Sequence, residues 1–206
     1  MFPARAGLCI VVLLAMSFAA AAAPSGPPPM PPGYDMGAVS NGDFEAGLTG
    51  WTTSANSGGV ALTAIGGDQV AFLYASGYDE DLGDEGQIPF SGFASLSQYV
   101  TVPLGYDQLA FVFWLVGDCG YVEVSLDSEH LFYRDWSTAD WVNEVASIPE
   151  SLAGGTHLLE FYIETAPGSF LDEYLYLDYV SITPEPATLA LLAVGGVGVL
   201  LRRRSV

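Results

Sequence analysis

The sequence contains no lysine, and cationic side chains are scarce along the whole chain. Its arginines are Arg5, Arg134 and three residues near the C-terminal end, against 24 acidic residues, so the formal net charge is −19. Of these acids, 22 lie between residues 38 and 183, where Arg134 is the single basic residue. Binding to nucleic acid or to an anionic membrane surface requires several Lys and Arg side chains that neutralise phosphate. The composition therefore excludes both as partners.

Cysteine and the common catalytic motifs are equally scarce. Cys9 lies in an N-terminal segment that we expect to be removed, so Cys119 is left as a single thiol without a disulfide partner. With only His130 and His157 as potential bases in the sequence, we interpret Cys119 as inert rather than catalytic. G-x-S-x-G, HExxH and phosphate-binding glycine motifs are absent. These absences favour a protein that is not an enzyme.

An amphipathic helical pattern is missing between residues 38 and 183, where apolar residues instead alternate with polar ones. Val122, Val124 and Leu126 show this period of two, which is typical of strands with one face in a core. Residues 107–117, DQLAFVFWLVG, are apolar on both faces and predict a central strand. About ten such candidates, at a spacing of roughly 8 to 15 residues, predict an all-β domain with a β-sandwich architecture.

The N-terminal end predicts export. Arg5 is followed by an apolar segment from Leu8 to Ala23 that ends in small residues, which is typical of a secretory signal peptide over residues 1–23. Residues 24–37, PSGPPPMPPGYDMG, predict an extended proline-rich leader. Residues 38–183 are then long enough for one domain.

The C-terminal segment 184–206 has three parts. Pro184, Glu185 and Pro186 form a tripeptide that favours exposed, extended backbone. An apolar run over residues 187–201 follows, and its 15 residues would span roughly 22 Å as a helix, against about 30 Å for a bilayer core. Arg202, Arg203 and Arg204 come next and favour the cytoplasmic side of a membrane. The run therefore predicts a short transmembrane helix that anchors only marginally.

This three-part tail resembles the PEP-CTERM sorting signal, which a membrane protease-transpeptidase of the exosortase type recognises in Gram-negative bacteria that produce exopolysaccharide. The resemblance implies an exosortase as partner and processing near Pro184, Glu185 and Pro186. It also implies a transient anchor in the inner membrane through the C-terminal helix, followed by delivery to the cell surface or the extracellular matrix. Both covalent attachment and simple release after cleavage remain open.

A second resemblance covers residues 39–183. Five motifs carry it in order: VSNGDFEAGLTGW, SLSQYVTVP with LAFVFWL, VEVSLDSEHLF, GGTHLLEFYIE and LYLDYVSI. Together they resemble the jelly-roll domains of carbohydrate-binding modules of the galactose-binding type. The commonest closing pattern of that family is Asp-Asn, where this chain has Asp178 and Tyr179. The resemblance implies a jelly-roll β-sandwich.

The same resemblance implies a structural Ca²⁺ between the two ends of the domain. It assigns Glu45 and Asp178 as the most direct ligands and Asp43 as a weaker companion. The alternative is that Asp43 is a turn residue and Glu45 is solvated, since acidic side chains also keep secreted proteins soluble. A second acidic segment, YDEDLGDEG at residues 78–86, does not have EF-hand spacing and predicts a solvated loop.

Aromatic side chains suggest a glycan-binding surface. If Phe111, Phe113, Leu159 and Phe161 point into the core, the period of two places other side chains on the opposite face of their strands, and these are Trp114, Glu160 and Tyr162. Trp136 and Trp141 are alternatives carried by a loop. We therefore expect non-catalytic glycan binding, with exopolysaccharide as a candidate partner. The alternatives are a purely structural matrix protein or, less favoured, an enzyme that acts on polysaccharide through a carboxylate pair.

Overall fold

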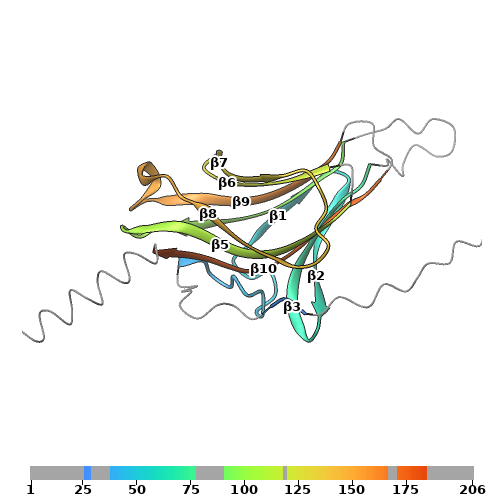
Figure 1. The fold of residues 1–206 in the computed structure, drawn as a ribbon, viewed down its shortest axis with the longest axis horizontal. Helices are drawn as coiled ribbons and strands as arrows, with labels where there is room; N and C mark the ends of the chain where they lie inside the picture. Colours follow the sequence, from blue (N-terminus) through green and yellow to red (C-terminus); the bar gives the residue numbers. More distant parts are fainter. Residues whose placement is uncertain (1–25, 29–37, 78–90, 118–119, 167–170, 185–206) are drawn as a thin grey trace, which may run out of the picture.

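The computed structural model describes residues 26–28, 38–77, 91–117, 120–166 and 171–184. Within these residues the protein is all-β, with ten strands in two five-stranded sheets and no α-helix (Figure 1). A short 3₁₀ turn, η3 (Glu150–Leu152), precedes β9. The predicted β-sandwich is confirmed.

The first sheet, called the β9 sheet after its central strand, has the order β1-β4-β9-β6-β7. All of its pairings are antiparallel. Its strands are β1 (Thr52–Ala55), β4 (Phe93–Thr101), β9 (Thr156–Thr165), β6 (Gly120–Leu126) and β7 (Glu129–Arg134).

The second sheet, called the β10 sheet, has the order β2-β3-β10-β5-β8 and is also antiparallel throughout. Its strands are β2 (Gly58–Ile65), β3 (Asp68–Ala75), β10 (Glu173–Pro184), β5 (Tyr106–Val116) and β8 (Val142–Ser147). The predicted central strand at residues 107–117 is β5, which lies between β10 and β8.

The core lies between the two sheets, and alternation along the strands fills it. Phe111 and Phe113 of β5 are 2% and 1% exposed, and Leu159 and Phe161 of β9 are fully buried. The rings of Phe111 and Phe161 meet edge to face with centroids 5.4 Å apart, which joins the two sheets directly. The prediction that these four side chains point inward is confirmed.

The chain between Ala38 and Trp51 closes one side of the sandwich. Val39, Phe44 and Trp51 are buried in the core, and the backbone N–H of Val180 in β10 donates to the carbonyl of Gly42 at 2.9 Å. The two ends of the domain lie together, as the resemblance implies. The turn segment before β1 makes this contact with β10, whereas β1 itself pairs with β4.

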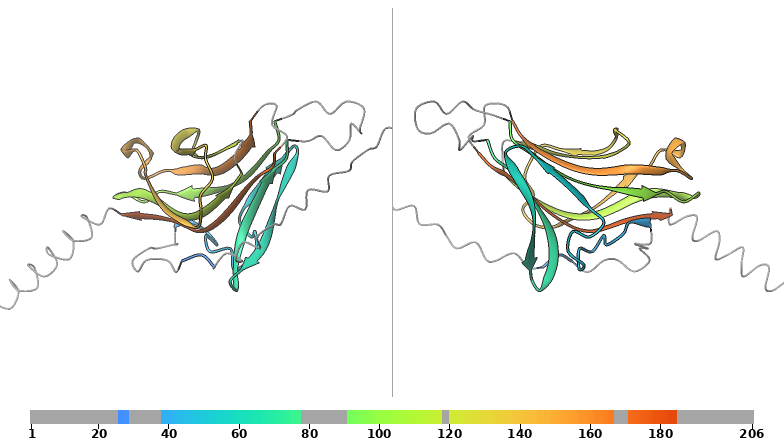
Figure 2. Two further views of the ribbon diagram at one scale, coloured as in Figure 1. Left: turned by 45° about the vertical axis from the view of Figure 1, so that its right-hand side comes forward. Right: turned by 180° about the vertical axis from the view of Figure 1, so that it is seen from behind.

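Both sheets are bowed in the same sense, so the outer face of the β9 sheet lies on the hollow side and that of the β10 sheet on the bulging side (Figure 2). Antiparallel sheets twist and coil in this way because each strand has its own right-handed twist. The two outer faces are thus different in shape.

Several predictions concern residues outside the described part of the chain. They are the signal peptide, most of the proline-rich leader, the acidic loop at 78–86, Cys119, and the tail from Glu185 onward, with Arg202, Arg203 and Arg204. Within the described ranges, no helix has the length and apolar character needed to cross a membrane.

Candidate functional site

The outer face of the β9 sheet carries aromatic, acidic and hydroxyl side chains in cross-strand rows. Strand pairing sets the rows, because residues opposite each other in neighbouring strands share a face. The first row is Phe93, Glu164 and Tyr121; the second is Ser95, Tyr162, Glu123 and Tyr133; the third is Thr52, Ser97, Glu160 and Ser125. Two residues predicted from the sequence, Glu160 and Tyr162, lie on this face.

Glu164 holds two tyrosines in this surface. Its Oε2 accepts hydrogen bonds from the hydroxyl groups of Tyr121, at 2.6 Å, and Tyr162, at 2.9 Å. Burial, and then the adjacent Glu164 carboxylate, raise the pKa of both hydroxyls well above their usual value of 10. Both tyrosines therefore stay neutral donors at any physiological pH, and their rings are fixed by a shared acceptor.

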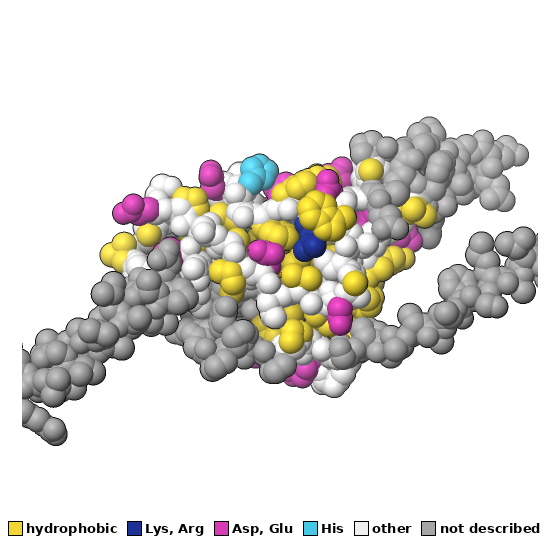
Figure 3. Space-filling view, viewed as in Figure 1, with side chains coloured by type: hydrophobic (Ala, Val, Ile, Leu, Met, Phe, Trp, Pro, Cys, Tyr) yellow, Lys and Arg dark blue, Asp and Glu magenta, His cyan; other side chains and the backbone are white. Residues whose placement is uncertain are grey.

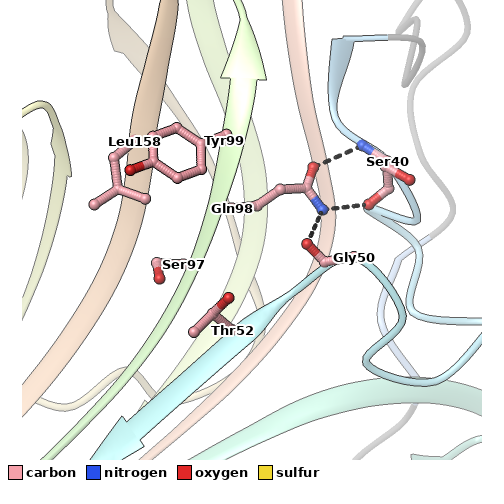
Figure 4. Close-up of a pocket in the computed structure, with 7 residues that line it drawn as sticks. All are labelled: Ser40, Gly50, Thr52, Ser97, Gln98, Tyr99 and Leu158. Atoms are coloured by element: carbon pink, nitrogen blue, oxygen red, sulfur yellow. Dashed lines mark hydrogen bonds between the residues drawn. The ribbon is translucent and has the colours of Figure 1, made fainter.

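A hollow of about 470 Å³ lies at the other end of this face. Thr52, Ser97, Tyr99 and Leu158 line it, together with Ser40, Gly50 and Gln98 (Figure 4). Tyr99 is 73% exposed and makes no ring contact with another described aromatic residue. Ser97 pairs with Glu160 across β4 and β9, so the hollow is continuous with the row that contains Glu160.

Gln98 builds one wall of the hollow. Its side chain is 6% exposed, accepts from the N–H of Ser40 at 2.8 Å, and donates to the carbonyls of Ser40, at 2.9 Å, and Gly50, at 3.1 Å (Figure 4). These bonds tie β4 to the segment before β1. The wall is therefore rigid, because every bond ends on backbone atoms.

Trp114 does not belong to this surface, and the predicted trio of Trp114, Glu160 and Tyr162 is wrong as a single platform. Trp114 lies on β5 in the β10 sheet, where its ring stacks on Tyr176 with centroids 5.0 Å apart. Glu160 and Tyr162 lie on β9 in the other sheet. Period-two alternation places all three on outer faces, but those faces lie on opposite sides of the sandwich.

The aromatic residues of this face differ in whether a neighbouring ring covers them. Phe93 and Tyr162 stack with centroids 5.6 Å apart, and Tyr121 and Tyr133 stack at 5.3 Å, so each ring covers a face of its neighbour. Sugar rings stack on open aromatic faces. Tyr99 offers such a face beside the hollow, and the sequence reasoning missed it because its position in YVTVP gives no sign of exposure.

A second cluster of functional interest surrounds Asp178 on the outer face of the β10 sheet. Asp178 is 1% exposed; its Oδ1 accepts the N–H of Tyr179 at 2.8 Å, and its Oδ2 is buried without a hydrogen-bond partner. Burial, with added repulsion from Asp68, Asp43 and Glu45, raises the pKa of Asp178 to about 8. The N–H of Gln69 donates to Glu45, which holds that carboxylate beside β3. Asp43, Glu45 and Asp68 thus lie near enough to Asp178 for their charges to raise its pKa.

The backbone around Asp178 adopts conformations that non-glycine residues seldom use. Asn41, Phe44 and Tyr179 have φ values of 53°, 55° and 51°. Tyr179 lies at an irregularity in the pairing of β10 with β5, and Asn would adopt this left-handed conformation more readily than Tyr. A Cβ at Gly42 would overlap the carbonyl of Val180. Such strain is maintained only where the surroundings impose it.

The donor set around Asp178 fits a hard cation in its chemistry. Carboxylate oxygens are the ligands that Ca²⁺ prefers, and a buried carboxylate oxygen without a partner is a free ligand position. Within the described residues, however, no group of three or more Asp, Glu, His or Cys side chains is arranged closely enough to hold an ion. Side-chain rotation at Asp43, Glu45 or Asp68 would be required.

The end of β10 leads directly into the C-terminal tail. Pro184, the last described residue, is opposite Tyr106 of β5. A family model described as the PEP-CTERM protein-sorting motif matches residues 183–204. The motif therefore begins inside the last strand of the sandwich.

Comparison with solved structures identifies the fold. The carbohydrate-binding module TmCBM61, solved with β-1,4-galactotriose, is 17% identical, with 72% of this chain and 98% of that chain covered and a TM-score of 0.50. A module CBM27-1 of Caldicellulosiruptor saccharolyticus, solved with mannohexaose, is 16% identical, with 70% and 96% covered and a TM-score of 0.47. An adhesin domain of Lys-gingipain from Porphyromonas gingivalis is 16% identical, with 71% and 98% covered and a TM-score of 0.48.

No curated protein matches the chain in sequence. The TmCBM61 comparison supports the jelly-roll fold, and the motif match implies export and sorting by an exosortase. The chain thus has a C-terminal segment that matches the PEP-CTERM sorting motif, and this segment follows a jelly-roll β-sandwich whose fold is similar to that of TmCBM61.

Proposed function

We propose that this sandwich is a non-catalytic glycan-binding domain of a cell-surface or exopolysaccharide-matrix protein, and that the glycan lies across the outer face of the β9 sheet. The proposal takes the signal peptide as residues 1–23, the leader as 24–37, the domain as 38–183 and the sorting segment as 184–206. Export followed by sorting through an exosortase would place the domain where it meets extracellular polysaccharide.

The observation that carries the proposal is the open ring of Tyr99 beside a hollow lined by hydroxyl groups. A 73% exposed aromatic ring is available to the apolar face of a sugar, and Thr52 and Ser97 supply donors and acceptors next to it. Glu160 follows in the same row as Ser97, where a carboxylate can accept hydrogen bonds from sugar hydroxyls. TmCBM61, which has the same fold, was solved with a galactose oligosaccharide.

Structural calcium is a second part of the proposal. Ca²⁺ at Asp178, with Glu45 and Asp43 as in the resembling domains and with Asp68 in addition, would supply a partner for the unpaired Oδ2. The ion would neutralise repulsion among these carboxylates and fasten the turn segment before β1 to β10. We expect the ion mainly to stabilise the folded state, because it would join this segment to β10.

Glycan binding can be tested with variants of matched tyrosines. The probes are β-1,4-galactotriose, mannohexaose and cellohexaose, measured by titration calorimetry with the purified protein. Tyr99→Ala removes the open ring beside the hollow, and Tyr74→Ala removes a 37% exposed tyrosine from the outer face of the other sheet. Removal of an aromatic residue that is a binding hot spot weakens binding about tenfold or more.

We expect at least one probe to bind, Tyr99→Ala to weaken it about tenfold or more, and Tyr74→Ala to leave it unchanged. Equal loss in both variants, or no loss in Tyr99→Ala, would overturn the assignment of this face. Absence of binding to any probe and to exopolysaccharide from the producing cells would favour a purely structural role. Shortening of the probes during incubation would identify an enzyme instead.

A further inference from the structure

Arg134 is the only formally charged cation among the described residues, and no carboxylate pairs with it. The ion pairs within the described ranges both use histidine, His130 with Glu123 at 2.8 Å and His157 with Asp127 at 2.7 Å. Arg134 is partly buried, and its Nε has no hydrogen-bond partner. In a domain with 22 acidic residues, an unpaired guanidinium is unexpected, because such groups usually satisfy their donors with carboxylates.

The position of Arg134 explains its isolation from the acidic side chains. Arg134 is opposite Val122 across β7 and β6, and Val122 is a core residue, so the Arg134 side chain points toward the other sheet rather than to the outer face. Its Cζ lies 5.6 Å from the ring centroid of Phe113 in β5. The guanidinium is therefore at the open side of the sandwich, between the edge strand β7 and the β10 sheet.

Trp136 completes this small site. The Arg134 Cζ lies 5.1 Å from the ring centroid of Trp136, so the guanidinium covers one face of the indole. Trp136 is nonetheless 61% exposed. Figure 3 shows this single cationic side chain on the viewed face, next to hydrophobic side chains. The exposed Trp136 ring thus lies directly beside a guanidinium whose Nε has no hydrogen-bond partner.

We propose that Arg134 and Trp136 form a second carbohydrate site, distinct from the face with Tyr99, that takes a sugar bearing a carboxylate, such as a uronic acid within an acidic polysaccharide. The sugar ring would lie on the open face of Trp136, and its carboxylate would accept hydrogen bonds from the guanidinium. Arg suits this role because its planar fork matches a carboxylate with two parallel donors. An uncharged sugar would leave these donors unsatisfied.

The net negative charge of the domain disfavours binding of any acidic ligand. The informative quantity is therefore the difference in affinity between a charged sugar and its uncharged counterpart at the same site. At about 0.15 M salt the Debye length is about 8 Å, so most of the repulsion from distant carboxylates is screened. A direct guanidinium–carboxylate hydrogen bond is screened much less. The affinity difference between a uronide and its uncharged counterpart therefore reports on Arg134.

The test measures tetragalacturonate and its carboxyl-reduced counterpart by titration calorimetry at that salt concentration, without calcium, which could bridge carboxylates. We expect wild-type protein to bind the uronide at least tenfold more tightly than the reduced probe. Arg134→Gln should remove this preference, and Trp136→Ala should weaken both probes. Arg134→Lys should retain part of the preference, because it keeps the charge without the fork.

The outcomes separate this site from the face with Tyr99. Tyr99→Ala should leave the uronide preference intact, and melting curves establish that each variant is folded. An unchanged preference in folded Arg134→Gln, or equal binding of the two probes by wild type, would overturn the proposal. Competition by a tetraglutamate peptide as effective as that by tetragalacturonate would also overturn it and would point to a protein carboxylate as the ligand.

Discussion

At the residue scale, Asp178 combines features that no other described residue shares. It is buried, has one unpaired oxygen, and lies near three further carboxylates. Tyr179, which donates to it, has a left-handed backbone. Without a ligand, such a residue destabilises the folded state, because an uncompensated buried polar group costs about 1 to 3 kcal/mol.

The first prediction concerns calcium at Asp178. An ion present at roughly 100 times its dissociation constant stabilises the native state by about 2.7 kcal/mol. For a domain of this size, we expect the melting temperature to rise by about 5 to 10 °C. Differential scanning calorimetry of the wild type and of Asp178→Asn, with and without calcium, measures the effect, and the increment should vanish in the variant.

Sodium chloride at matched ionic strength is the control for this prediction, since screening alone also stabilises a domain of charge this negative. The response to sodium should survive in Asp178→Asn. A variant that keeps the whole calcium increment would show that the ion binds elsewhere or acts diffusely.

The second prediction concerns pH and Asp127. A hydrogen bond from the N–H of Leu158, then one with the His157 ring, hold the pKa of Asp127 below its usual value of 3.8. A carboxyl group with a lowered pKa in the folded state stabilises that state above the pKa of the unfolded chain. The contribution of Asp127 to stability should therefore be complete above about pH 4 to 5 and decline as the pH falls through the lowered pKa.

Urea unfolding between pH 7 and pH 2 measures this effect. In Asp127→Asn the midpoint should be lower at pH 7, and the gap to wild type should close in acid. Glu129→Gln, in the same hairpin, is the control and should leave the acid dependence of the wild type in place. If the difference in urea midpoint between wild type and Asp127→Asn is the same at pH 2 as at pH 7, the proposed role of the Asp127 charge is contradicted.

At the element scale, β10 has two roles. It is the central strand of its sheet and carries Asp178, and its last two residues belong to the sorting motif. Thr183 and Pro184 lie opposite Gln108 and Tyr106 of β5. A processing enzyme that requires extended, accessible backbone at the motif would have to act at the edge of a folded domain.

The third prediction follows from this overlap. Insertion of a six-residue Gly/Ser linker between Thr183 and Pro184 moves the motif away from the sandwich, and we expect processing in cells to become several-fold faster. Pulse labelling followed by gel analysis measures the rate. The same insertion between Ala139 and Asp140, in the exposed connection before β8, controls for the added residues. Equal rates in wild type and linker variant would show that paired strand ends do not hinder the enzyme.

At the scale of the whole molecule, the two outer faces and the open side of the sandwich have different surfaces. The β9 sheet presents Tyr99 and the row with Glu160, the β10 sheet presents the ring pair of Trp114 and Tyr176, and Arg134 lies at the side. A protein with binding sites on separate sides could connect two polysaccharide chains. If both proposed sites bind glycan, this arrangement would suit the proposed role in an extracellular matrix.

The fourth prediction concerns the fate of the tail. Because 15 apolar residues anchor only marginally, we expect mature surface protein to lack the segment after about Pro184. Intact-mass measurement of protein released from the cell surface tests this. Glu185→Ala, or deletion of Arg202, Arg203 and Arg204, should leave unprocessed protein in the inner membrane. Surface protein that still carries the three arginines would contradict processing.

The sequence by itself determined the features that depend on neighbouring residues. Period-two alternation predicted strands and inward side chains such as Phe111 and Phe161, because successive residues of a strand face opposite sides. The sorting motif is likewise a continuous stretch of chain. The prediction that Glu45 and Asp178 share a Ca²⁺, by contrast, rests only on the resemblance to a family.

The tertiary structure decided which residues share a surface. Alternation assigns a side chain to one of two faces but does not tell to which sheet its strand belongs. The sequence alone therefore groups Trp114 with Tyr162, although their sheets lie on opposite sides of the core. Strand order likewise added Asp68 to the Asp178 cluster and brought Arg134 over Phe113. These contacts join distant parts of the chain, and only the packing of the two sheets determines them.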